Sequence, residues 1–274
     1  MKISNTPSAP CWADLSTTDP AAARDFYGTL FGWDCAVAPE PEAGGYGLFK
    51  DERGAAVGGV GPVMNPGQPA AWLPYFQSDG VDAVAARVTG NGGQTLAGPM
   101  PVLEQGFMAV CADPGGAVFG LWEPRDHPGF GTVNSPGSFC WFELATRDTA
   151  GAKDFYQSVF GWGDATHPFT RGERPGEYTE WSVAGDTFGG MLAIDGTFPP
   201  EVPPHWLAYV AVDDCDAAAV GCTGLGGSVL VEPTTIDPGR FAVLADPQGA
   251  VFAVLAYAGE QPPAGEQPPV TPSA

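Results

Sequence analysis

The sequence predicts an α+β fold produced by tandem duplication, because one helical segment and one turn motif each occur twice. Residues 26–33 read Phe-Tyr-Gly-Thr-Leu-Phe-Gly-Trp, and residues 155–162, which begin 129 positions later, read Phe-Tyr-Gln-Ser-Val-Phe-Gly-Trp. The turn Asp-Pro-x-Gly occurs at 113–116 and again at 246–249. Further identities at the 129-residue spacing join Cys11, Trp12, Leu15 and Asp19 to Cys140, Trp141, Leu144 and Asp148. Identities at one fixed spacing indicate an internal repeat.

Each copy of the repeated segment has the pattern of a helix, at 19–31 and at 148–160. Asp19 can accept hydrogen bonds from the first free N–H groups, and Gly32 follows where a chain leaving a helix often needs a positive φ. Apolar residues between them recur every three or four positions and form one stripe. Asp148 and Gly161 bracket the second copy in the same way. We expect the aromatic residues of both stripes to pack in the core.

Short apolar strands and one further helix complete each half. In the first half we expect strands at 11–16, 46–49, 57–60, 72–77, 107–111 and 118–122, with a helix marked by Val81, Val84 and Val88. In the second half we expect strands at 139–146, 178–183, 188–192, 206–212, 240–244 and 251–255, with a helix at 214–223. These elements predict domains at 1–123 and 138–258, a Pro- and Gly-rich linker at 124–137, and a disordered Pro-rich tail at 259–274, which has few apolar groups to bury.

Four strand–helix–strand units in two pairs, the helix motif Asp-x6-Phe-Tyr and the turn Asp-Pro-x-Gly together resemble the vicinal oxygen chelate superfamily. That superfamily includes glyoxalase I, the bleomycin-resistance proteins and the extradiol dioxygenases. The resemblance covers residues 11–123 and 139–256. It implies tandem glyoxalase-like domains, each of two βαβββ modules that form a curled half-barrel around a concave site, or cup. Metal-dependent members of the superfamily place four ligands in the cup.

The four positions that match those ligands hold no metal-binding side chain in either half. They fall at Trp12, 58–59, Leu73 and Gly120, and again at Trp141, 189–190, Leu207 and Ala253. The chain has three histidines, at 127, 167 and 205. Because metal sites need several His, Glu, Asp or Cys donors that converge, the sequence predicts no metal site and no cofactor.

Strand alternation predicts which side chains line the two cups. The first cup is expected to contain Trp12, Asp14, Tyr75, Gln77 and Trp122, and the second Trp141, Glu143, His205 and Tyr209. Glycines opposite tryptophans suggest a flat slot for a planar or apolar small molecule. The alternative is that the tryptophans fill the vacated metal site and close the cup.

Glu143 and His205 are the candidate acid and base, because a carboxylate and an imidazole in an apolar site shift each other's pKa toward neutrality. Tyr209 is expected to add a hydrogen bond. The alternative is a buried polar pair without catalytic function, or two residues that never meet.

The favoured function is metal-independent binding of a small apolar or aromatic metabolite, as the resemblance to the bleomycin-resistance branch implies. The alternatives are a glyoxalase- or hydroxylase-like enzyme that uses Glu143 and His205, and a metal-dependent lyase or dioxygenase. The net charge of −21 disfavours nucleic acid and anionic membrane surfaces as partners. No signal peptide or membrane span is visible, and the six cysteines lack a CxxC pair, which indicates reduced thiols and a cytoplasmic protein. Because each chain supplies both modules of each implied barrel, we expect a monomer.

Overall fold

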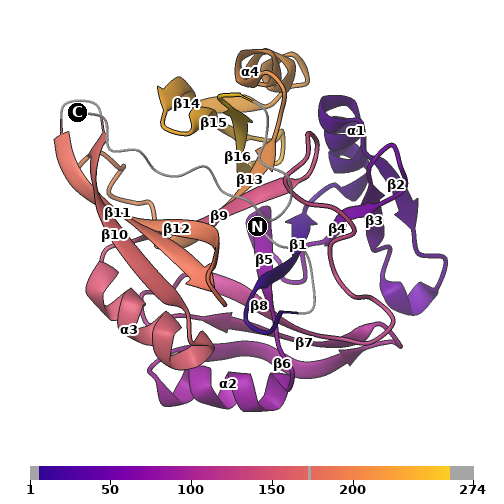
Figure 1. The fold of residues 1–274 in the computed structure, drawn as a ribbon. Helices are drawn as coiled ribbons and strands as arrows, with labels where there is room; N and C mark the ends of the chain where they lie inside the picture. The colour runs from indigo at the N-terminus through magenta and orange to yellow at the C-terminus, as the bar shows by residue number, and fades with distance from the viewer. Residues whose placement is uncertain (1–5, 172–173, 260–274) are drawn as a thin grey trace.

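A computed structural model describes residues 6–171 and 174–259. It contains two eight-stranded sheets with four α-helices, which confirms the predicted α+β class and the duplication (Figure 1). Except for Gly259, the predicted tail lies outside the described residues.

The first sheet contains strands β1 to β8. Its elements are β1 (Pro10–Thr17), α1 (Pro20–Phe31), β2 (Asp34–Val37), a 3-10 turn (Pro41–Ala43), β3 (Gly47–Lys50), β4 (Ala56–Pro62), β5 (Ala71–Gln77), α2 (Val81–Gly90), β6 (Gln94–Val102), β7 (Gly106–Ala112) and β8 (Val118–Pro124). The strands lie in the order β2-β3-β4-β1-β5-β8-β7-β6.

The second sheet repeats this arrangement strand for strand. Its elements are β9 (Phe139–Thr146), α3 (Thr149–Phe160), β10 (Gly163–Arg171), β11 (Arg174–Val183), β12 (Asp186–Ala193), β13 (His205–Ala211), α4 (Cys215–Gly224), β14 (Ser228–Ile236), β15 (Gly239–Ala245) and β16 (Val251–Tyr257). The order is β10-β11-β12-β9-β13-β16-β15-β14. Each sheet therefore consists of two βαβββ modules, joined by the antiparallel pairs β1–β5 and β9–β13.

The predicted helix signals act as expected. Asp19 accepts a hydrogen bond from the Ala22 amide at 3.0 Å, and Asp148 accepts one from the Gly151 amide at 2.9 Å. Gly32 and Gly161 follow the two helices with φ values of 73° and 71°, which a residue with a Cβ adopts only at a cost.

The two halves share one core, in which the repeated helix motif of each half meets the repeated turn of the other. Tyr27 on α1 donates a hydrogen bond to Asp246 at 3.1 Å, and Tyr156 on α3 donates one to Asp113 at 3.1 Å. Figure 1 shows the same exchange between helices, since α1 lies near α4 and α2 lies beside α3. The aromatic stripes predicted to pack in the core therefore also join the two halves.

Four strands, namely β2, β6, β10 and β14, are absent from the segments that residue patterns predict, although the βαβββ modules implied by the family resemblance include them. All four are at the edges of their sheets. Exposed residues recur through β6 and β14, and β2 has no buried residue. Edge strands have only one neighbour and bury little, so their sequences carry a weak apolar signal.

All six cysteines are free thiols, in agreement with the predicted reduced state. Among residues 6–171 and 174–259, no helix is long and apolar enough to cross a membrane.

Candidate functional site

The ladder register places the predicted cup residues on one face of each sheet. Residues directly opposite in an antiparallel pair point to the same side. In the first sheet Trp12 lies opposite Tyr75, and Asp14 lies opposite Leu73; we call this side the first cup face.

The second sheet has the same arrangement. Trp141 lies opposite Tyr209, and Glu143 lies opposite Leu207; this side is the second cup face. The two tryptophan–tyrosine pairs therefore occupy corresponding places.

Glu143 is the polar centre of the second cup face, and its side chain is held by two phenols. Only 8% of Glu143 is exposed. Its Oε1 accepts from the Tyr209 hydroxyl at 2.9 Å, and its Oε2 accepts from the Tyr178 hydroxyl at 2.8 Å. Trp141 Nε1 donates to the Tyr178 hydroxyl at 2.9 Å, so the tryptophan orients the phenol that orients the carboxylate. Burial, followed by the negative charge of Glu143, raises the pKa of Tyr178 well above its usual value.

Asp14 is the corresponding centre of the first cup face. Its Oδ1 accepts from the Tyr46 hydroxyl at 2.6 Å and from Trp12 Nε1 at 2.9 Å. Burial raises the pKa of the Asp14 carboxyl, and hydrogen bonds from Tyr46, Trp12 and Tyr75 oppose that rise. The two halves thus share one motif: a carboxylate on the first strand of the sheet, two phenols and an indole.

Sequence reasoning missed Tyr46 and Tyr178 as site residues. Both begin segments that the sequence predicts as strands, and the hydroxyl of each reaches the carboxylate of its own half. A Cβ at Gly59 would overlap the Tyr46 hydroxyl, and a Cβ at Gly190 would overlap the Tyr178 hydroxyl. The glycines therefore make room for the phenols, and these matched Tyr and Gly positions were the available signal.

His205 is predicted to lie beside Glu143 as its acid–base partner, and it shares the second cup face with Glu143. It begins β13 on the second cup face, opposite Ala145, and its Nδ1 lies 2.9 Å from the Pro203 carbonyl oxygen. The hydrogen bonds described for Glu143 come from Tyr178 and Tyr209. The Glu143 carboxylate therefore lies between two phenols, and its pairing with the His205 imidazole stays a prediction.

Gln77 and Trp122 lie side by side at the end of the first cup face that is farther from Asp14. They are partners in the parallel β5–β8 ladder, and they are 5% and 6% exposed. Trp122 Nε1 donates to the His127 carbonyl oxygen at 2.9 Å. The equivalent ladder position in the second half holds Ala211 and Leu255, so this end of the site differs between the halves.

The donor set of either cup face does not fit a divalent metal ion. The ligand positions implied by the family resemblance hold Trp, Gly, Leu or Ala, and each cup centre has one carboxylate that is already hydrogen-bonded to phenols. Within the described part of the chain, no group of three or more His, Cys, Asp or Glu residues could hold a metal. Stable sites need several converging donors, so we derive no chemistry through a metal.

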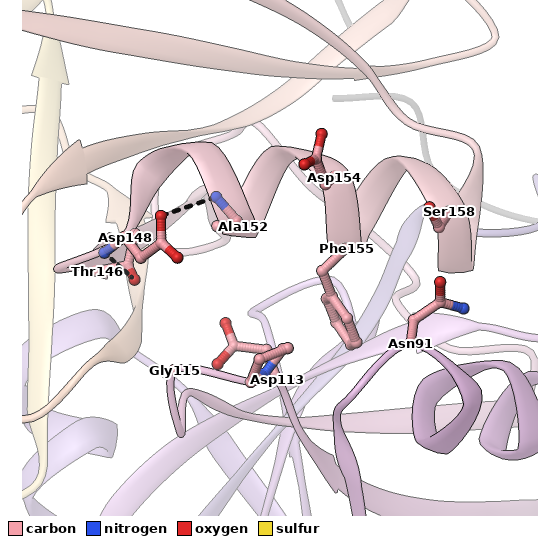
Figure 2. Close-up of a pocket in the computed structure, with 11 residues that line it drawn as sticks. Asn91, Asp113, Gly115, Thr146, Asp148, Ala152, Asp154, Phe155 and Ser158 are labelled. Carbon is pink, nitrogen blue, oxygen red and sulfur yellow. Dashed lines mark hydrogen bonds between the residues drawn. The ribbon is translucent and has the colours of Figure 1, made fainter.

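A separate pocket of about 280 Å³ lies between the two halves, beside α3 (Figure 2). Two of its three acidic residues already serve the fold: Asp148 caps α3, and Asp113 holds the Asp-Pro-Gly-Gly turn and the Tyr156 hydroxyl. Figure 2 shows Asp148 at the start of the helix and Asp113 on the turn below it. We therefore place the candidate site on the cup faces.

Comparison with known proteins agrees with this architecture. The family model of the Glyoxalase/Bleomycin resistance protein/Dioxygenase superfamily matches residues 11–121 and 138–254. A Mycobacterium tuberculosis protein named putative glyoxylase CFP32 is 39% identical over 256 residues, which cover 92% of this chain and 96% of the relative. The anthracycline biosynthesis protein DnrV of Streptomyces peucetius is 38% identical over 265 residues, which cover 91% of this chain and 93% of the relative.

Solved structures with low identity share the fold. The 2,3-dioxygenase LapB from Pseudomonas sp. KL28 superposes with a TM-score of 0.63 at 16% identity, covering 96% of this chain and 97% of its own. The Mn(II)-bound glyoxalase from Novosphingobium aromaticivorans gives 0.60 at 16% identity, covering 91% and 82%. The two family-model matches span most of the sequence, one in each half. The chain belongs to the Glyoxalase/Bleomycin resistance protein/Dioxygenase superfamily, with two tandem domains of that family.

Proposed function

We propose that this protein binds a small, planar aromatic metabolite on the second cup face. The observation that carries the proposal is the Glu143 carboxylate, which is 8% exposed and accepts hydrogen bonds from Tyr178 and Tyr209. Removing a carboxylate from water is costly, so a buried one that is held by two phenols beside an indole supports a role in recognition. Ligand sites commonly combine apolar and aromatic walls with a few convergent polar groups of this kind.

The chemistry of the cluster indicates the ligand class. The ring of the half-buried Trp141 offers a flat apolar surface, and Glu143 brings negative charge close to it. An aromatic compound with a hydroxyl or N–H donor satisfies both. The relative from Streptomyces peucetius is named for anthracycline biosynthesis, and anthracyclines are fused-ring aromatic compounds, which supports the same class.

A second candidate function is enzymatic proton transfer on such a metabolite. Trp141, Tyr178 and Glu143 form a chain of hydrogen bonds of 2.9 and 2.8 Å that fixes a carboxylate and a phenol as acid and base groups. His205 begins β13 on the same face and is the candidate second base. The name putative glyoxylase of the mycobacterial relative favours carbonyl chemistry of this type. A metal-dependent lyase or dioxygenase reaction requires several converging ligands, which the described residues of these cup faces do not provide.

The binding function is tested by titrating the protein with flat aromatic compounds, starting with 2-naphthol and 1,4-dihydroxyanthraquinone, and recording tryptophan fluorescence and melting temperature. We expect Glu143→Gln and Tyr178→Phe to weaken binding at least about 10-fold, which corresponds to about 1.4 kcal/mol. Glu177→Gln is the matched control for Glu143→Gln, because it removes the same negative charge from an exposed residue on the strand that carries Tyr178. Equal affinity of Glu143→Gln and wild type overturns the proposal.

The enzymatic alternative has its own readout. A panel of aromatic carbonyl compounds is incubated in D2O, and proton exchange next to the carbonyl is followed by NMR. Proton exchange that is lost in Glu143→Gln supports catalysis. Binding without proton exchange contradicts the enzymatic alternative and supports a binding function alone.

We also infer that the protein acts as a monomer in the cytoplasm. Each sheet is completed within one chain, and the six cysteines remain thiols. Sedimentation equilibrium at micromolar concentration tests the monomer, and a dimer mass contradicts it.

A further inference from the structure

We infer that the first cup face is a second copy of the ligand site and that the chain itself fills it. A connecting segment packs against Trp12 in the first half, at the place that corresponds to the ligand ring beside Trp141 in the second half. The connecting segment is residues 125–138, which join β8 to β9. The inference rests on the proposed function and adds that one chain binds one ligand, with an edge of an uncharged ring against Trp141.

The first observation is the packing of His127 and Phe130 on Trp12. The His127 ring lies 4.3 Å from the Trp12 ring between centroids at an interplanar angle of 83°, which is an edge-to-face contact. Phe130 lies 5.5 Å from the same indole. Aromatic pairs favour such separations. Trp12 is left only 3% exposed, so the aromatic surface that faces a ligand in the second half is covered in the first.

The second observation is that the connecting segment is bonded to the sheet beneath it. The Phe130 amide donates to the Cys11 carbonyl at 2.8 Å, and the Gly131 amide donates to the Ala56 carbonyl at 2.7 Å. A Cβ at Gly129 would overlap the Cys11 carbonyl oxygen, and Gly129 has a φ of 109°, so glycine permits this close approach. Trp122 holds the segment at His127, as described above.

The second half lacks this cover in the part of the chain that the structure describes. There Trp141 is half-buried, and none of the described residues packs a ring against it at an aromatic-contact distance. Leu255 stands where Trp122 stands in the first half, so the indole N–H that anchors the segment is missing. Residues 260–274 contain no histidine and no aromatic residue.

His127 also shows what kind of ring this site accepts. Burial lowers the pKa of the imidazole to about 4, so the ring is neutral at pH 7. Among the described residues, its buried Nε2 and the Gln77 Oε1 have no hydrogen-bond partner. The position beside the indole thus holds an uncharged planar ring with a polar edge, which matches the ligand class proposed for the second half.

The experiment removes the internal ring and offers it back as a free molecule. His127→Gly is titrated with imidazole at pH 8, with calorimetry and tryptophan fluorescence as readouts. We expect His127→Gly to bind one imidazole per chain. The wild type and the surface variant His167→Gly should bind imidazole at least about 10-fold more weakly. Equal imidazole binding by all three proteins overturns the inference.

The stoichiometry of the wild-type protein supplies the second arm. Titration with 2-naphthol is expected to give one site per chain, and Trp141→Phe is expected to weaken it at least about 10-fold. Two equivalent sites per wild-type chain overturn the inference. If 2-naphthol and 1,4-dihydroxyanthraquinone fail to bind, the proposed function loses its support, while imidazole binding to His127→Gly still decides whether the first site is self-occupied.

Discussion

Tyr156→Phe tests how the two halves are joined, because this substitution removes one hydroxyl from the centre of their shared core. Tyr156 is fully buried. Its hydroxyl donates to Asp113 of the other half at 3.1 Å and accepts from Trp206 Nε1 at 3.0 Å. Phenylalanine keeps the ring and its packing and deletes both hydrogen bonds.

The expected cost follows from these two contacts. A hydrogen bond to a charged group contributes about 1.5–3 kcal/mol, and a buried donor left without a partner costs about 1–3 kcal/mol. Asp113 still accepts from the Ala117 amide at 2.9 Å, so its carboxylate is not orphaned. Because contributions in one network are not additive, we expect the free energy of unfolding to fall by about 2–4 kcal/mol.

The assay is urea unfolding followed by tryptophan fluorescence and circular dichroism. Tyr156→Phe leaves the buried Trp206 N–H without its acceptor, and Trp206→Phe removes that N–H. The double variant Tyr156→Phe/Trp206→Phe should therefore lose about 1–2 kcal/mol less unfolding free energy than the two single losses added together. The repeat-related Tyr27→Phe, which removes bonds to Asp246 and from Trp72, should match Tyr156→Phe. A loss below about 0.5 kcal/mol for both tyrosine variants would refute the reasoning.

Two further predictions concern the cup faces. Gly190→Ala places a methyl group against the Tyr178 hydroxyl and should lower the free energy of unfolding by about 1–3 kcal/mol. In the control Gly196→Ala the added methyl group meets no atom within 4 Å, so the change should be less than about 0.5 kcal/mol. Equal urea midpoints for the two variants would contradict this prediction. His127 has a folded pKa of about 4, below the unfolded value of about 6.5, so its unfolded form binds more protons between these values. The free energy of unfolding of the wild-type protein should therefore fall by about 1–3 kcal/mol as the pH falls from 6.5 to 4, and His127→Gln should lack this decrease. Parallel plots of unfolding free energy against pH for the two proteins would contradict the prediction.

The helices, their caps and the central strands could be predicted from sequence because their signals are local. Asp19 and Gly32 bracket an apolar stripe, and the structure places the cap and the positive φ where the pattern predicts them. The edge strand β14 could not be recognised from its residues, since it alternates exposed and half-buried side chains along its length. The family resemblance supplied those strands, through the three strands that follow the helix in each module.

The candidate site was predictable only where it depends on strand alternation. Trp141, Glu143 and Tyr209 share a face, as their positions in the repeat indicate. Tyr178 reaches Glu143 from β11, and that contact depends on a register between strands that a single sequence does not specify. The composition of the connecting segment predicts a linker, but its packing against Trp12 is a tertiary contact without a local signal.

The most direct test of the central claim is a 19F NMR titration of protein labelled with 5-fluorotryptophan. Resonances of Trp12 and Trp141 are assigned by substituting each with phenylalanine, and 2-naphthol is then added to one equivalent. We predict that the Trp141 resonance shifts and saturates at one ligand per chain while the Trp12 resonance stays in place. A shift of Trp12 that equals or exceeds that of Trp141 would contradict both the site on the second cup face and the covered site on the first.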